Sequence, residues 1–107
     1  MYDQIDNNNN KILADNIKNL VNYAIEHNSE GAENYYQNFN SLKISIASEI
    51  LGFDVKSDKE RFHKSDLNLK INSIMIAIIR AGIEDEIYYK DIYKMAKSDL
   101  KKYAELQ

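Results

Sequence analysis

The chain has 107 residues and a formal net charge of −3, with no cysteine, no proline and only three glycines. This length indicates a single domain, and the lack of cysteine excludes disulfides and thiolate metal sites. Scarce glycine and proline favour helices joined by short turns over strand-rich folds. We therefore predict an all-α fold, a small bundle of four to five helices.

The two halves of the chain differ in charge. Residues 1–55 carry three lysines and eight acidic residues, whereas residues 56–107 carry eleven lysines and arginines and nine acidic residues. Neither half has the strong basic excess that is typical of nucleic-acid-binding domains. The first ten residues are acidic and polar, unlike a signal peptide, so we expect a cytoplasmic protein without a membrane segment. Abundant Ile, Asn, Lys and Tyr indicate an AT-rich genome.

The beginning of the chain predicts a tail and an amphipathic helix. Residues 1–9 are polar and asparagine-rich, which predicts a flexible N-terminal tail before a single helical domain over residues 10–107. Apolar residues then recur at three- and four-residue steps, which predicts a helix over about residues 10–28. Its expected apolar face comprises Ile12, Leu13, Ile17, Leu20, Val21, Ala24 and Ile25.

A second helix is predicted over about residues 30–52. Ser29 is the expected N-cap, and a polar stretch ending at Ser41 is a point where the helix could be interrupted. Gly52 is expected to end the helix in the left-handed conformation, with Phe53 packed behind it. Ser57 and Glu60 then form a capping-box pair, which predicts a short helix over about 58–64.

The most apolar helix is predicted over about residues 66–81. All six residues from Ile74 to Ile79 are apolar, so we expect this helix, central over 71–80, to be buried in the middle of the bundle. The surplus of apolar surface also favours a homodimer. Gly82 is expected to end the helix. Its most buried face should comprise Leu67, Ile71, Ile74, Met75, Ile78 and Ile79.

A last helix is predicted over about residues 84–105. It would open on Glu84, Asp85 and Glu86, and acids at a helix start complement the helix dipole. Four of its lysines recur at steps of four, three and four residues and so share one face. They are Lys90, Lys94, Lys97 and Lys101.

We expect no enzymatic activity. Cysteine nucleophiles are absent, and neither histidine lies near a nucleophile-elbow serine. His27 lies at a helix end, where a histidine commonly binds backbone carbonyl groups. No spacing of histidines and acidic residues matches a metal-binding motif, so neither a metal nor a cofactor is expected.

Two patterns favour nucleic-acid binding as an alternative. The lysine face of the last helix could follow a line of phosphates. The segment from Ile46 to Phe53 is similar to the first helix and turn of a helix-turn-helix motif. The segment in the position of a recognition helix would then carry Lys59, Arg61 and Lys64.

Tyrosines supply the strongest functional signal. Tyr35 and Tyr36 are adjacent, as are Tyr88 and Tyr89, and Tyr93 lies one helical turn further on. Adjacent helical residues point about 100° apart, so at least one of each pair should lie at the surface. Exposed tyrosines are favoured in binding hot spots. The competing interpretation is codon bias combined with packing at the edge of the core.

We therefore predict a small, non-enzymatic protein-binding module whose partner-binding residues are these five tyrosines. Mobile elements with AT-rich genomes often encode small proteins that block a host machine, so one hypothesis is a phage or mobile-element inhibitor of a host defence protein, such as an anti-CRISPR protein. A small nucleic-acid-binding transcriptional regulator is the alternative. A structural subunit of a larger assembly cannot be separated from the first hypothesis by sequence.

Overall fold

The computed structural model describes residues 2–63 and 65–107, with side chains from residue 7 onward except that of residue 63. None of the described residues lies in a strand, which confirms the predicted all-α bundle. The five helices are α1 (Tyr2–Glu26), α2 (Asn34–Leu51), α3 (Lys59–His63), α4 (Leu67–Glu84) and α5 (Tyr89–Glu105).

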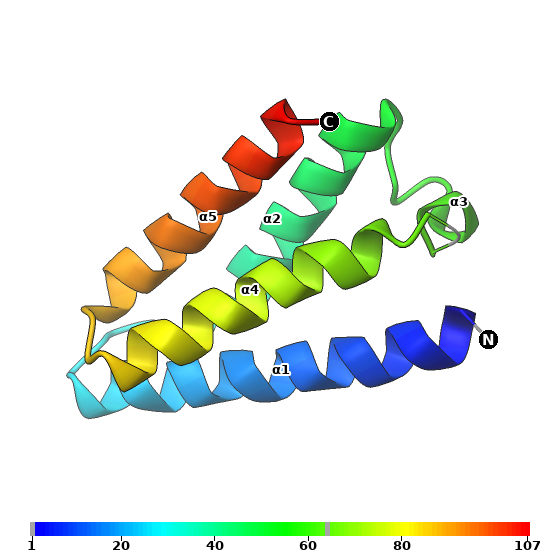
Figure 1. Cartoon of the computed structure of the whole chain (residues 1–107). Coiled ribbons are helices and arrows are strands. Elements are labelled where there is room, and N and C mark those ends of the chain that lie inside the picture. Colours follow the sequence, from blue (N-terminus) through cyan, green and yellow to red (C-terminus); the bar gives the residue numbers. More distant parts are fainter. Residues whose placement is uncertain (1, 64) are drawn as a thin grey trace.

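The four long helices form two pairs. Figure 1 shows α1 and α4 running side by side in the same direction, and α2 beside α5, with the pairs separating from one end of the bundle to the other. The short helix α3 contacts α1 and α4 at the open end. Helix α4 contacts all four other helices and has eight buried residues, more than α1, α2 or α5 has among the described side chains, so the central position predicted for the apolar helix is confirmed.

Helix α1 begins eight residues earlier than predicted, at Tyr2 rather than near Asn10. The asparagine run continues the helix, and Asn10 is held in place by hydrogen bonds to Asn68 and Asn72 of α4. A tertiary contact of this kind overrides the weak helix propensity of asparagine. The flexibility of residues 1–9 stays a prediction.

The buried face of α1 is narrower than predicted. Ile12 and Ile25 were assigned to it, but they are 43% and 56% exposed. Both lie at the edge of the face, where the neighbouring helix does not cover them. The buried members of the predicted set are Leu13, Ile17, Leu20, Val21 and Ala24.

Helix α2 begins at Asn34, so the prediction of Ser29 as its N-cap is wrong. A turn precedes it, in which Gly31 has a φ of 76° and the Asn34 N–H donates to the Gly31 carbonyl at 3.0 Å. The helix continues through Ser41 without a break. Its end is as predicted, because Gly52 is left-handed with a φ of 77° and its N–H donates to the Ser48 carbonyl at 2.9 Å.

Helix α3 begins one residue later than the capping-box prediction requires. Asp58 precedes its first residue, and its Oδ1 accepts the Arg61 N–H at 3.2 Å, as an N-cap does. The Ser57 hydroxyl donates to Oδ2 of Asp54 instead. The assignment of Ser57 as the cap was therefore wrong, although the short helix itself is present.

The connection between α4 and α5 differs from the prediction. Gly82 lies inside α4, which continues to Glu84, and a Cβ at Gly82 would be 2.6 Å from Cγ1 of Ile92. Its role is therefore close packing rather than termination. Asp85 and Glu86 lie in the connection and α5 begins only at Tyr89, so the three acids do not open a helix. Glu86, with a φ of 55°, makes the left-handed turn there.

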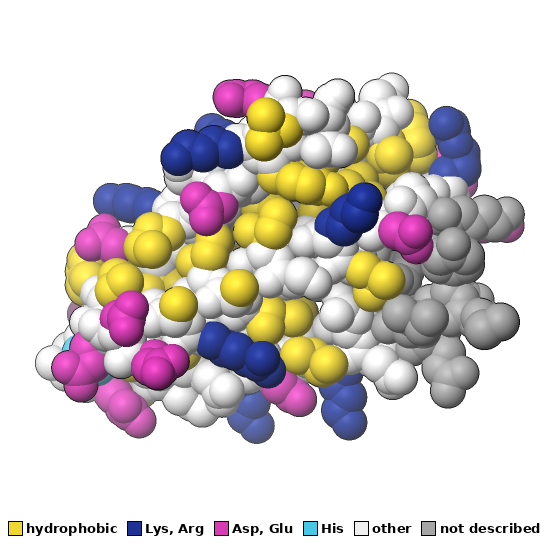
Figure 2. All heavy atoms as spheres, in the orientation of Figure 1, with side chains coloured by type: hydrophobic (Ala, Val, Ile, Leu, Met, Phe, Trp, Pro, Cys, Tyr) yellow, Lys and Arg dark blue, Asp and Glu magenta, His cyan; other side chains and the backbone are white. Residues whose placement is uncertain are grey.

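The buried face of α4 is partly polar. Ile74 and Ile78, predicted to be among its most buried residues, are only half-buried. Asn68 and Asn72 are completely buried, at 0% exposure. The predicted residues that are buried are Leu67, Ile71, Met75 and Ile79. Figure 2 shows hydrophobic side chains gathered over α4 and along its boundary with the α2–α5 pair. A homodimer through this face stays a prediction.

Candidate functional site

Aromatic residues from two distant segments lie together at the end of the bundle where α2 and α5 begin. Tyr35 and Phe39 of α2 contact Tyr93 of α5, and Tyr88 and Tyr89 lie near Tyr35. The Tyr93 ring lies 5.1 Å from the Phe39 ring in an edge-to-face arrangement and 6.1 Å from the Tyr35 ring. The Tyr88 and Tyr89 rings lie 4.7 Å apart. We name Tyr35, Phe39, Tyr88, Tyr89 and Tyr93 the aromatic cluster.

Local backbone geometry places the second tyrosine pair. Tyr88 occupies the N-cap position of α5, and its carbonyl accepts the N–H groups of Asp91 and Ile92 at 2.9 and 3.2 Å. One residue earlier, the Ile87 carbonyl accepts the Tyr23 hydroxyl of α1 at 2.7 Å. These contacts fix the start of α5 against α1, so the position of Tyr88 is set by the fold.

Exposure divides the tyrosines as helical geometry requires. Tyr36 and Tyr88 are 43% and 51% exposed, while Tyr35 and Tyr93 are half-buried and Tyr89 is buried at 7%. Each pair thus has one member at the surface. Tyr36 points away from the aromatic cluster, towards a groove that it lines with residues of α1. The structure therefore brings together four of the five predicted tyrosines, and Tyr89 among them belongs to the core.

Burial changes the acid–base behaviour of two cluster hydroxyls. Partial burial raises the pKa of Tyr35 above its ordinary value of 10.0, and the neighbouring Tyr89 and Tyr88 raise it further. Partial burial also raises the pKa of Tyr93. Both hydroxyls therefore keep their protons to a higher pH than an exposed tyrosine does, and the Tyr93 hydroxyl donates to the Asn38 carbonyl at 3.5 Å.

Acidic residues lie close in sequence to the aromatic cluster, as do the exposed Lys90 and Lys94. Glu33 precedes Tyr35, and Glu84, Asp85 and Glu86 precede Tyr88, and all four are exposed. Figure 2 shows acidic side chains gathered at the end of the molecule where α4 ends. A partner of this surface would therefore meet aromatic rings bordered by negative charge.

The residues of the nucleic-acid alternative do not form one surface. The four lysines of the predicted face lie exposed on α5, as expected. Arg61 lies in α3 instead, with its guanidinium 4.0 Å from the Phe53 ring centre and 3.9 Å from the Asp58 carboxylate. Lys59 is exposed beside it, whereas Lys64 lies outside the described residues. With five residues, α3 is shorter than a recognition helix that reads a major groove.

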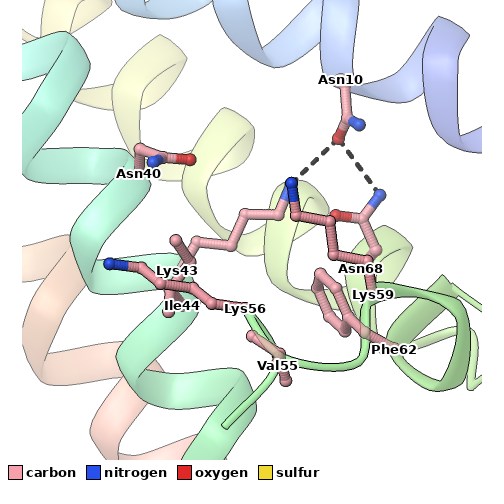
Figure 3. Close-up of a pocket in the computed structure, with 9 residues that line it drawn as sticks. All are labelled: Asn10, Asn40, Lys43, Ile44, Val55, Lys56, Lys59, Phe62 and Asn68. Atoms are coloured by element: carbon pink, nitrogen blue, oxygen red, sulfur yellow. Dashed lines mark hydrogen bonds between the residues drawn. The ribbon is translucent and has the colours of Figure 1, made fainter.

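Sequence reasoning missed a polar pocket of about 510 Å³ between α1, α2, α3 and α4. At its inner end, Oδ1 of Asn10 accepts three hydrogen bonds, from Nζ of Lys43 at 2.9 Å, Nδ2 of Asn68 at 3.1 Å and Nδ2 of Asn72 at 2.7 Å. Figure 3 shows the first two of these contacts. The signal for it was the polar residues on an otherwise apolar helix face.

Catalytic and metal-binding constellations are not evident in the part of the chain that the structure describes. No group of three or more His, Asp or Glu side chains there could hold a metal ion. Nδ1 of His27 lies 2.8 Å from the Tyr23 carbonyl, at a helix end as predicted. Among the described residues, no helix is both long and apolar enough to cross a bilayer.

Comparisons with known proteins do not assign this chain to a family. Neither protein-family models, nor curated proteins, nor solved structures gave a significant match to this chain.

Proposed function

We propose that this chain is a small, non-enzymatic protein-binding module whose partner binds at the aromatic cluster. The observation that supports this most is the convergence of Tyr35, Tyr88 and Tyr93, from two distant segments, on one partly exposed surface. Tyrosines offer a large contact area, lose little conformational entropy on binding, and are enriched in binding hot spots.

The surroundings of the cluster define the kind of partner. The exposed acids Glu33, Glu84, Asp85 and Glu86 would favour a protein with a basic surface, because complementary charge at the rim accelerates association and selects partners. The same acids disfavour nucleic acid at this end of the bundle. We further propose, from composition alone, that the partner is a host protein blocked by a phage or mobile-element inhibitor.

Affinity capture from lysates of bacteria with AT-rich genomes, with and without nuclease, tests this proposal. Tyr88→Ala is the informative variant, and Tyr36→Ala is its matched control because Tyr36 is similarly exposed but lies outside the aromatic cluster. We expect a nuclease-resistant protein that is retained by Tyr36→Ala and lost by Tyr88→Ala. Equal retention by both variants, with the same affinity for the purified partner, would contradict the proposal.

A nucleic-acid-binding regulator remains the second candidate, because Lys90, Lys94, Lys97 and Lys101 share one exposed face of α5. Binding through this face should weaken steeply with salt, since each phosphate contact releases counterions. Substituting Lys94 and Lys97 with glutamine should reduce the salt dependence. If no DNA or RNA, single- or double-stranded, binds at low salt, this candidate fails.

A further inference from the structure

The polar pocket has the volume of a small-molecule site and shares no residue with the aromatic cluster. Its volume of about 510 Å³ falls within the range of roughly 300–1,000 Å³ found for ligand pockets. It lies at the open end of the bundle, where the two helix pairs separate and α3 closes the gap. Segments from four parts of the chain therefore form its walls.

The charged side chains of the lining are all basic. Lys43, Lys56 and Lys59 line the pocket, whereas no aspartate or glutamate among the described residues does. The ammonium groups of Lys56 and Lys59 have no carboxylate partner in the part of the chain that the structure describes. A negatively charged group would therefore be attracted to this opening.

Asp54 and Asp58, which lie next to the lysines in the chain, bind other groups instead of the ammonium groups of Lys56 and Lys59. Asp54 accepts the Lys56 backbone N–H at 3.1 Å and the Ser57 hydroxyl at 3.3 Å. Asp58 accepts the Arg61 N–H and lies beside its guanidinium. Both carboxylates thus hold the loop that presents the lysines.

A buried acceptor at the inner end lacks a donor. Asn68 is 0% exposed, and its Oδ1 has no hydrogen-bond partner among the described residues. Figure 3 shows its amide nitrogen turned towards Asn10 and its oxygen directed away from that contact. This oxygen is closed off from solvent, so a ligand N–H group can reach it only when neighbouring side chains move aside. Because a buried acceptor without a partner is unfavourable, such a contact would stabilise the complex.

The rest of the lining is apolar. Ile44, Val55 and Phe62 contribute hydrophobic surface between the lysines and the amides. A ligand that matched the whole lining would combine negative charge, an apolar body and an N–H donor. Nucleoside phosphates combine these three properties, whereas inorganic phosphate has only the first.

We propose that this pocket binds a nucleoside monophosphate. Lys56 and Lys59 hold the phosphate, the base lies against Ile44 and Val55, and an N–H group of the base donates to Oδ1 of Asn68. Asn40, exposed at the rim, offers an amide to the sugar hydroxyls.

Isothermal titration of the full chain with AMP, GMP, CMP and UMP tests the proposal. We expect one-site binding of at least one nucleotide, weakened about tenfold or more by Lys56→Gln/Lys59→Gln, because hydrogen bonds to charged groups are among the stronger ones. The matched control, Lys97→Gln/Lys101→Gln on α5, should change the affinity less than about twofold. Chemical-shift changes on binding should include the backbone amides of Val55 and Phe62.

Several results would overturn the proposal. They are the absence of saturable binding by all four nucleotides, and inorganic phosphate binding as tightly as the best nucleotide. A third is a result in which Lys97→Gln/Lys101→Gln loses nucleotide binding while Lys56→Gln/Lys59→Gln retains it. That result would place the phosphate-binding site on α5, as expected if α5 bound a nucleic-acid strand.

Asn68→Leu separates the role of the amide from that of the lysines. We expect it to abolish discrimination between nucleotides while leaving the helical circular dichroism spectrum unchanged. If Asn68→Leu does not fold, Asn40→Ala at the exposed rim takes its place and should weaken binding of every nucleotide but not of inorganic phosphate. Unchanged discrimination in Asn68→Leu would overturn the assignment of the base site, and unchanged nucleotide binding in Asn40→Ala would overturn that of the sugar contact.

Discussion

The two ends of α4 bury different kinds of side chain, apolar ones towards its C-terminus and asparagines towards its N-terminus. Its C-terminal half packs Met75, Ile79 and Gly82 tightly, with Gly82 so close to Ile92 that no side chain fits. Its N-terminal half buries Asn68 and Asn72, whose Oδ1 atoms have no partner among the described residues. Since leucines in those positions would avoid the loss of hydration, the polar end is not explained by stability alone.

The two ends of α4 lie next to different candidate sites. The tightly packed end carries the start of α5 and the aromatic cluster, so Tyr88 is displayed on a rigid base. The polar end opens into the pocket between the helix pairs. Rigid packing supports a protein-binding surface, whereas buried amides suit the recognition of a small polar ligand.

The largest effect is expected for Ile79→Ala, which removes a completely buried side chain from the tightly packed half. We expect the free energy of unfolding in urea to fall by about 2–5 kcal/mol, from lost burial and the cavity left behind. Ile74→Ala is the control in the same helix and should cost less, because Ile74 is only half-buried. Equal losses would contradict the described orientation of α4.

Gly82→Ala should lower the free energy of unfolding by about 1–3 kcal/mol, because the new Cβ overlaps Ile92. This loss should appear although alanine favours a helix by up to about 1 kcal/mol over glycine. A double-mutant cycle with Ile92→Ala should show that the cost of Gly82→Ala is much smaller when Ile92 is shortened. Additive effects would mean that the two residues are not in contact.

Asn68→Leu tests the polar half and should change the free energy of unfolding by less than about 1 kcal/mol in either direction. The variant loses the hydrogen bond to Asn10 but also removes an unpartnered oxygen, and such exchanges are often nearly neutral. Urea denaturation of Asn68→Leu and Ile79→Ala under the same conditions compares the two changes in the free energy of unfolding. A loss as large as that of Ile79→Ala would show that the amide is structural.

The smallest effect is expected from pH. The pKa values of Tyr35 and Tyr93 are raised in the folded state, so the folded protein binds these protons more tightly than the unfolded chain. Their contribution to stability is complete below the unfolded pKa of 10.0 and is lost as pH rises through the folded pKa values. Urea denaturation from about pH 8 to 11 should show this loss, and Tyr35→Phe/Tyr93→Phe should reduce it.

Much of the fold follows from local patterns, and the failures have physical causes. The position of the apolar helix was predictable because six consecutive apolar residues favour burial, although burial is not complete on all sides, since Ala77 is exposed and Ile74 and Ile78 are half-buried. Helix boundaries were less predictable. Gly82 resembles a terminator in sequence, but its role depends on Ile92, ten residues away. Ser29 and Ser57 have the chemistry of caps, yet the positions of neighbouring turns assign that role elsewhere.

The candidate sites show the same limit. The surface members of the tyrosine pairs followed from helical geometry, but the meeting of Tyr35 with Tyr93 depends on how α2 lies against α5. The pocket could not be predicted, because Asn10, Lys43 and Asn68 become neighbours only through the packing of three helices.

The contact of α1 with α4 also sets the order in which this chain can fold as it is synthesised. The hairpin of α4 and α5 closes over a short connection, whereas the Tyr23 hydroxyl of α1 binds a carbonyl 64 residues further on. Local contacts form early because they close small loops. Leu13 and Leu20 of α1 are buried, so the apolar face of α1 stays partly uncovered until the more distant α4 packs against it.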